Sequence, residues 1–428
     1  MISKLVTRVS LVLLTGIVLI TAPAKRASGA AAPSGLHFSS KSMGPTDAYA
    51  WAPEGNTLVY ATHDGSVWSV KGPSFAQPSR LIKIDVPPDG DIEQLVWSPD
   101  GRNVAIVSPR SGKLWDTIWL LDIKTLKLRN LLPLGDSIDV PGVRFLRISA
   151  WLRDGRIMFF MGCGTGCQSL HAVQTRENEQ YWEFCYASGD FFWAPDQSIA
   201  VVQNEDGGVA PQGLGLVLAS TEVAVGELNY LPERQCKSTF EASLGESVQF
   251  NSWFSDSRTV LYSRANIKDR RSQLNVWDTR SGSRKVLVAD GSSGAVSPDG
   301  RYVSFIYHKF GMNQSTKQVS LQIMDLGSKR VVASAEIPTV DSPPKWSPSM
   351  GYLAMVTFPS GDQVFVAKLG SHGVRVCRLN VKGRDLSWSA DGKYLVVSEF
   401  ERPGSGLTIF KFPYVKPFKA RSLADFTH

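Results

Sequence analysis

The sequence lacks the compact motifs that most often mark an active site. It has no Gly-x-x-x-x-Gly-Lys-Ser/Thr phosphate loop, no His-Glu-x-x-His zinc helix, no Cys-x-x-Cys pair and no Gly-x-Ser-x-Gly nucleophile elbow. Histidine is scarce, with six residues scattered over 428 positions. No apolar period of 3.6 residues is sustained after residue 30. These absences disfavour nucleotide-binding, zinc-peptidase and α/β-hydrolase chains, and they argue against long helices after residue 30.

The feature that the sequence does have is a repeat. Eight times, an aromatic or apolar residue runs into a tight polar turn and then into a β-rich stretch. These anchor residues are 42 to 60 positions apart, and a four-stranded propeller blade needs roughly 40–50 residues. We therefore predict an all-β chain folded as an eight-bladed β-propeller of four-stranded antiparallel blades. The anchors are Trp51, Trp97, Trp151, Trp193, Trp253, Val296, Trp346 and Trp388.

The turn after each anchor has a physical explanation. The clearest copies read Ser-Pro-Asp-Gly at 98–101 and 297–300 and Ser-Ala-Asp-Gly at 389–392. Proline presets φ, aspartate suits the next position, and glycine supplies the positive φ that reverses the chain. We expect positive φ at Gly101 and Gly300. These residues resemble the TolB-like propeller family over residues 45–412, which implies a propeller whose turn motif carries no chemistry.

The first thirty residues have the form of a secretory signal peptide. Lys4 and Arg8 precede a short apolar run at 9–22, and small residues follow at 27–30. Cleavage near Ala30 predicts a periplasmic or secreted protein with no stable membrane insertion, and an uncleaved anchor is the alternative. We assign 31–44 to a linker or closing strand and 45–428 to one propeller domain. In this scheme 36–40 pairs beside 407–412 and closes the ring.

The charge of the predicted mature chain is modest. The first thirty residues contain four basic residues and no acid, so their removal lowers the formal net charge from +7 to +3. This value is too small to argue for a nucleic-acid partner. An envelope protein or a glycan is the partner that we expect.

Five cysteines in an exported chain favour disulfides. Cys163 and Cys167 flank a glycine-rich turn and form the first predicted bridge, and Cys185 with Cys236 is a second candidate. Cys377 is expected to be free. The alternative for the first pair is a metal site with His171, which lacks an evident fourth ligand.

Binding is the function that remains for such a chain. Three connections exceed the minimum length, and they contain the binding candidates Trp115, Arg234, His308 and Phe310. Acidic residues also recur where inner strands begin, which suits either a solvated channel or a funnel cation such as calcium, and no cofactor is predicted. We favour a non-enzymatic binding or scaffold protein. The alternative is a secreted lyase or hydrolase of polysaccharide or peptide, with its site in the funnel.

Overall fold

The computed structural model divides the chain into two units, Met1–His37 and Phe38–His428. It describes residues 39–418 except 88–89, 110–115, 133–145, 163–167, 177–180, 188, 205–212, 220–222, 225–237, 242–245, 267–270, 311–315, 339, 341, 358–362, 371–372, 384, 399–405 and 416. The predicted signal peptide lies outside the described residues. Among them, no helix is long and apolar enough to cross a membrane.

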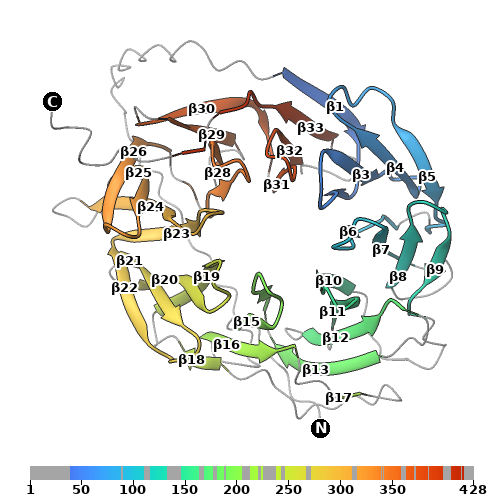
Figure 1. The fold of residues 1–428 in the computed structure, drawn as a ribbon, viewed down its shortest axis with the longest axis horizontal. Helices are drawn as coiled ribbons and strands as arrows, with labels where there is room; N and C mark the ends of the chain where they lie inside the picture. The colour runs from blue at the N-terminus through green and yellow to red at the C-terminus, as the bar shows by residue number, and fades with distance from the viewer. Residues whose placement is uncertain are drawn as a thin grey trace, which may run out of the picture. The chain divides into compact units, whose positions relative to one another are not determined.

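Eight antiparallel sheets are arranged in a ring (Figure 1), which confirms the predicted eight-bladed propeller. Blade 1 consists of β2 (Tyr49–Trp51), β3 (Thr57–Ala61), β4 (Ser66–Lys71) and β5 (Ser79–Lys83), and blade 2 consists of β6 (Gln94–Trp97), β7 (Asn103–Pro109), β8 (Asp116–Asp122) and β9 (Leu128–Asn130). Blade 3 consists of β10 (Leu146–Trp151), β11 (Arg156–Gly162), β12 (Gln168–Gln174) and β13 (Tyr181–Ala187), and β17 (Val223–Ala224) pairs with its outer strand β13. Blade 4 consists of β14 (Phe191–Trp193), β15 (Ile199–Asn204), β16 (Gly213–Leu218) and β18 (Ser238–Glu241), and blade 5 consists of β19 (Glu246–Trp253), β20 (Thr259–Asn266), β21 (Arg271–Asp278) and β22 (Arg284–Ala289). Blade 6 consists of β23 (Gly291–Val296), β24 (Tyr302–Phe310), β25 (Thr316–Asp325) and β26 (Arg330–Glu336). Blade 7 consists of β27 (Lys345–Trp346), β28 (Tyr352–Thr357), β29 (Gln363–Gly370) and β30 (Gly373–Lys382). Blade 8 consists of β31 (Asp385–Trp388), β32 (Tyr394–Ser398), β33 (Gly406–Lys411) and, as its outer strand, β1 (Ser39–Pro45).

The first and the last strands of the described chain pair with each other in blade 8. Strand β1 pairs antiparallel with β33, with Ser39 opposite Lys411 and Pro45 opposite Gly406. The prediction placed this outer strand at 36–40: residues 39 and 40 lie in β1, which continues to Pro45, and residues 36–38 lie outside the described residues. The pairing covers the strand edge that the last blade would otherwise leave open.

Every predicted anchor is the last residue of an inner strand, the first strand of its blade. The fifth residue of each repeat then has positive φ in all eight copies, including Gly101 (69°) and Gly300 (71°) as predicted. Three loose copies lack glycine there, yet the chain keeps the same turn with Gln197, Ser257 and Met350 at φ values of 64°, 52° and 57°. The turn geometry is therefore a property of the blade and not of glycine alone.

The serine of the turn is a structural residue in its own right. Ser98 is buried, and its Oγ donates to Oδ1 of Asp100 and accepts from the backbone N–H of Asn103 at 2.9 Å. Copies six and eight repeat both bonds. This hydroxyl closes the turn by satisfying a backbone donor that would otherwise be buried without a partner.

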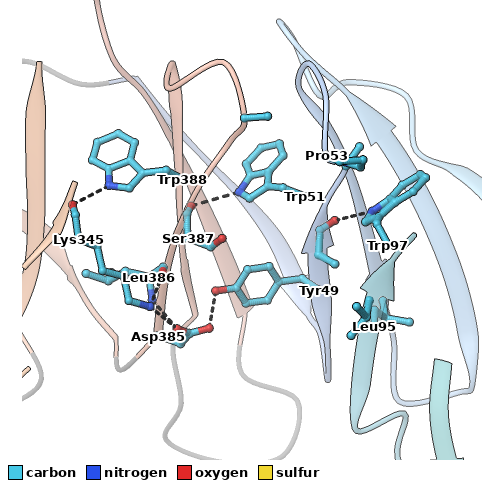
Figure 2. A pocket seen from close by; sticks show the side chains of 14 residues that line it. Tyr49, Trp51, Pro53, Leu95, Trp97, Lys345, Asp385, Leu386, Ser387 and Trp388 are labelled. Atoms are coloured by element: carbon cyan, nitrogen blue, oxygen red, sulfur yellow. Dashed lines mark hydrogen bonds and ion pairs between the residues drawn. The ribbon is translucent and has the colours of Figure 1, made fainter. Parts of the chain in front are cut away.

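The tryptophan anchors join neighbouring blades by a repeated hydrogen bond. Nε1 of Trp51 donates to the carbonyl oxygen of Ser387 at 3.1 Å, and Nε1 of Trp97 donates to that of Ala50 at 3.2 Å (Figure 2). In each case the acceptor immediately precedes the anchor of the preceding blade. Trp253, Trp346 and Trp388 make the same bond, and Trp193 reaches the hydroxyl of Ser149 instead. The anchors thus connect the blades as well as filling the core.

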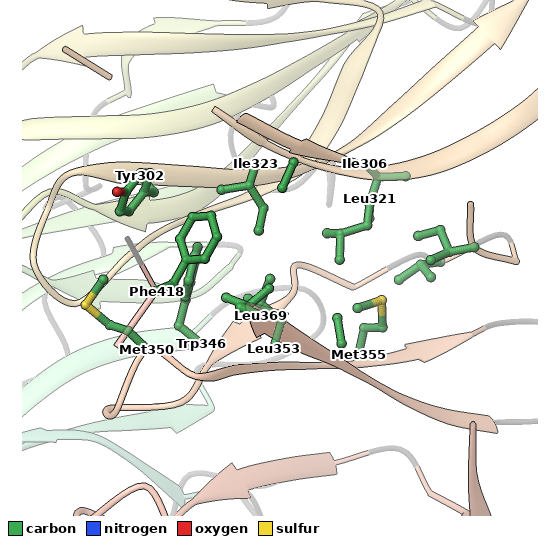
Figure 3. Packing of buried hydrophobic residues seen from close by; sticks show 14 residues of the cluster. Tyr302, Ile306, Leu321, Ile323, Trp346, Met350, Leu353, Met355, Leu369 and Phe418 are labelled. Atoms are coloured by element: carbon green, nitrogen blue, oxygen red, sulfur yellow. The ribbon is translucent and has the colours of Figure 1, made fainter. Parts of the chain in front are cut away.

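Apolar clusters lie between the blades, and one of them includes the tail that follows the last strand. Phe418 is 4% exposed between blades 6 and 7, where it packs edge-on against Tyr302 at 5.0 Å between ring centroids (Figure 3). Its backbone N–H donates to the carbonyl of Met350 at 3.3 Å. The tail is therefore part of the folded core.

Candidate functional site

The inner strands of blades 8, 1 and 2 border a hollow of 570 Å³. Lys345 of blade 7 completes its wall, and Figure 2 shows the residues from close by. Small residues flank two of the anchors on this wall: Ala50 and Ala52 in blade 1, and Ser387 with Ala390 in blade 8. The lining residues are Tyr49, Ala50, Trp51, Ala52, Pro53, Leu95, Val96, Trp97, Lys345, Asp385, Leu386, Ser387, Trp388 and Ala390.

Three tryptophans of adjacent blades, Trp388, Trp51 and Trp97, follow one another along this wall (Figure 2). Each indole N–H is already used by a backbone carbonyl of the preceding blade. The rings therefore offer mainly apolar surface to the hollow. An apolar or aromatic group is the ligand chemistry that such a surface favours.

The polar end of the hollow is a set of three side chains from three blades. Oδ2 of Asp385 accepts from the hydroxyl of Tyr49 at 2.7 Å, and Oδ1 lies 3.2 Å from Nζ of Lys345. Nζ also donates to the carbonyl of Leu386 at 2.7 Å. Burial, followed by the neighbouring Asp385, raises the pKa of Tyr49 well above its usual range. Tyr49 is therefore a neutral hydrogen-bond donor, and the opposite charges of Asp385 and Lys345 balance.

Ion pairs of the same kind link other inner-strand entrances. Arg147 pairs with Asp190 between blades 3 and 4, and Glu246 pairs with Arg264 within blade 5. Alternating acid and base is what a solvated channel requires, because each charge then has a nearby partner of opposite sign.

Blades 1 and 2 depart from this balance. Burial raises the pKa of Asp47 and of Asp116 to about 6. Burial, with Asp116 and Asp91 as further causes, raises the pKa of Glu93 to about 7. This part of the molecule thus concentrates carboxyl groups that resist ionisation.

Asp116→Asn is expected to stabilise the protein above pH 6. The pKa of Asp116 is raised from 3.8 to about 6 on folding, so between these values the folded state keeps a proton that the unfolded chain releases. Wild-type stability contributed by this group is therefore full below about pH 4 and is lost as pH rises through about 6. Asparagine can still accept from the N–H of Leu146, as Oδ2 of Asp116 does at 3.2 Å.

Allowing for solvent screening, we expect a gain on the order of 1 kcal/mol at pH 7.5 and a smaller one at pH 4.5. Urea midpoints of variant and wild type at the two pH values measure it. Equal midpoints at both pH values would contradict the assignment.

Neither of the two described binding candidates, His308 and Phe310, lines the hollow. Trp115 and Arg234 lie outside the described residues, and Phe310 ends β24 on blade 6. His308, on the same strand, has its Nε2 2.8 Å from Oγ of Ser292. Asp385 is one of the acids that recur where inner strands begin, whereas Tyr49 and Lys345 were not predicted, because their only signal in the sequence is a position one or two residues before an anchor.

The cysteines are described in part. Cys377 is free, as predicted, and burial raises the pKa of its thiol. Cys185 is disulfide-bonded, and Cys163, Cys167 and Cys236 lie outside the described residues. Both pairings therefore stay predictions. His171, the third ligand of the alternative metal site, is buried, with Nε2 2.6 Å from Oγ of Ser169.

No family model and no curated protein matches the chain. Solved structures do: the C-terminal WD40 domain of Sif2 is 13% identical, with 88% of this chain and 99% of that chain covered and a TM-score of 0.50. The Dos1 propeller is 11% identical (89% and 96% covered, TM-score 0.49), and an oligogalacturonate lyase in complex with manganese is 9% identical (88% and 97% covered, TM-score 0.48). At such identities the likeness concerns the fold alone. The chain has a WD40-like β-propeller fold.

Proposed function

We propose that this protein is an exported, TolB-like propeller that acts as a binding scaffold. Its hollow receives an apolar or aromatic side chain of a protein partner. The observation that carries the proposal is the row of Trp388, Trp51 and Trp97, whose indole donors are all used within the protein. Aromatic walls of this kind form the anchor pockets in which partner side chains contribute most binding energy.

The hollow is large enough for a side chain or a short segment of a partner. Its 570 Å³ lies within the usual range of roughly 300–1,000 Å³ for ligand pockets. Lys345, half exposed at its ammonium-bearing side chain, can donate to a backbone carbonyl of the partner beside the apolar contact. Because Asp385 balances that charge, the site has no net attraction for a strongly anionic ligand.

Export is supported by two observations. The first thirty residues have the composition of a signal peptide. Cys185 is disulfide-bonded, and disulfides persist mainly in oxidising compartments such as the periplasm or the cell exterior.

A peptide selection tests the proposed function. Random peptides displayed on phage are selected on wild type and on Ser387→Arg, which places a long cation in the hollow. The matched control is Ser252→Arg, the equivalent position of blade 5, one residue before the anchor Trp253. We expect peptides with a shared aromatic or large apolar residue to bind wild type and Ser252→Arg, and to bind Ser387→Arg at least tenfold more weakly.

Equal binding of the peptides to all three proteins would show that the hollow is not the partner site. Retention of glycans but of no peptide on a mixed array would instead favour the glycan alternative. Turnover of a bound glycan or peptide would favour the funnel-enzyme alternative.

A further inference from the structure

Three side chains from two neighbouring blades converge beside the inner strands, outside the hollow. Asp47 lies between β1 and β2, His63 lies in the turn between β3 and β4, and Asp91 precedes β6. One carboxylate oxygen of each aspartate and a ring nitrogen of the histidine all lie within 4.8 Å of one another. That spacing lets a single ion contact all three atoms, because metal–ligand bonds to oxygen and nitrogen measure about 2.0–2.2 Å.

The two blades hold these groups in place before any ion arrives. Ala48 and Ile92, which directly follow the two aspartates, are 7% and 1% exposed in one apolar cluster between blades 1 and 2. The N–H of Asp47 donates to the carbonyl of Ala61 at 3.0 Å, which fixes it beside the histidine turn. The donor set is therefore built on ordered backbone.

One carboxylate oxygen of each aspartate is buried at the centre of the set. Oδ2 of Asp47 is screened from solvent and accepts no hydrogen bond, and Oδ1 of Asp91 is screened from solvent beside Nδ1 of His63. Nδ1 of His63 and Oδ1 of Asp91 are in direct contact, so the ring nitrogen already faces the carboxylates. A buried carboxylate oxygen without a donor is costly, and a cation that contacts Oδ2 of Asp47 removes that cost.

We propose that Asp47, His63 and Asp91 bind one divalent transition-metal ion, with Zn²⁺ as the best match, and thereby clamp blade 1 to blade 2. A set of two carboxylates and one imidazole suits Zn²⁺, while Ca²⁺ requires six to eight oxygen ligands. Nδ1 of the imidazole supplies the nitrogen ligand. None of the three residues lines the hollow, so this site is independent of the partner site.

Titration calorimetry on the untagged protein tests the site, with Zn²⁺ and Ca²⁺ as separate probes. We expect one Zn²⁺ per chain, a thermal midpoint raised by Zn²⁺, and little effect of Ca²⁺. His63→Gln and Asp47→Asn should each weaken Zn²⁺ binding at least tenfold. The matched control is Glu336→Gln, an acid on outer strand β26, which should bind as wild type does.

The His63→Gln variant is expected to fold, because the side chain of His63 is 57% exposed. Circular dichroism of the variant checks this. Binding of Co²⁺ supplies a second readout, since four- or five-coordinate Co²⁺ absorbs visible light more strongly than the aqueous ion, and His63→Gln should weaken that absorption. Zn²⁺ affinity that is unchanged in both variants, or lowered equally in Glu336→Gln, would overturn the proposal, as would binding of Ca²⁺ in preference to Zn²⁺.

Discussion

Phe418→Ala is expected to destabilise the protein by about 3–5 kcal/mol, although the residue lies after the last strand. Its ring is buried between blades 6 and 7 against Tyr302 and Trp346, so truncation leaves a cavity in a core that both blades share. The surrounding strands are fixed in their sheets and can close that cavity only in part. The urea midpoint of unfolding, followed by tryptophan fluorescence, measures the effect.

Tyr414→Ala is the matched control for this prediction. Tyr414 belongs to the same tail but is 74% exposed, so its truncation should change stability by no more than about 0.5 kcal/mol. Similar midpoints for both variants and wild type would mean that the tail does not belong to the core in solution.

Replacement of the anchor Trp253 has the second large expected effect. The ring is 9% exposed among apolar residues of blades 4 and 5, and its Nε1 donates to the carbonyl of Phe192 at 2.8 Å. Trp253→Ala removes both the packing and the bond, and about 3–5 kcal/mol should be lost. Trp253→Phe keeps most of the packing and should lose about 1–2 kcal/mol, because a carbonyl loses its donor.

The difference between the two variants separates packing from the hydrogen bond between blades. Urea denaturation of both proteins under the same conditions measures it. A Trp253→Phe variant as stable as wild type would show that packing alone accounts for the recurrence of tryptophan at this position.

The sequence predicted the propeller because its signals are local. Each anchor, turn and following apolar strand lies within about ten residues, and the repeat brings the eight copies into register. The role of Ser98 was missed, because the pattern drew attention to proline and glycine. The structure shows that its buried hydroxyl closes the turn.

The candidate site could not be predicted in this way, because its contacts are formed by ring closure. Tyr49 and Asp385 are 336 positions apart, and they meet only because blade 8 closes beside blade 1. The burial of Phe418 was not predicted for a related reason. The tail belongs to no repeat, and the space between blades 6 and 7 that Phe418 fills exists only in the folded ring.

A crystal structure of the protein with a selected peptide tests the central claim most directly. The account predicts that a large apolar or aromatic side chain of the peptide occupies the hollow against Trp51 and Trp388, with a peptide carbonyl near Nζ of Lys345 (Figure 2). A peptide bound on blades 3 to 6 instead, with the hollow unchanged, would contradict it.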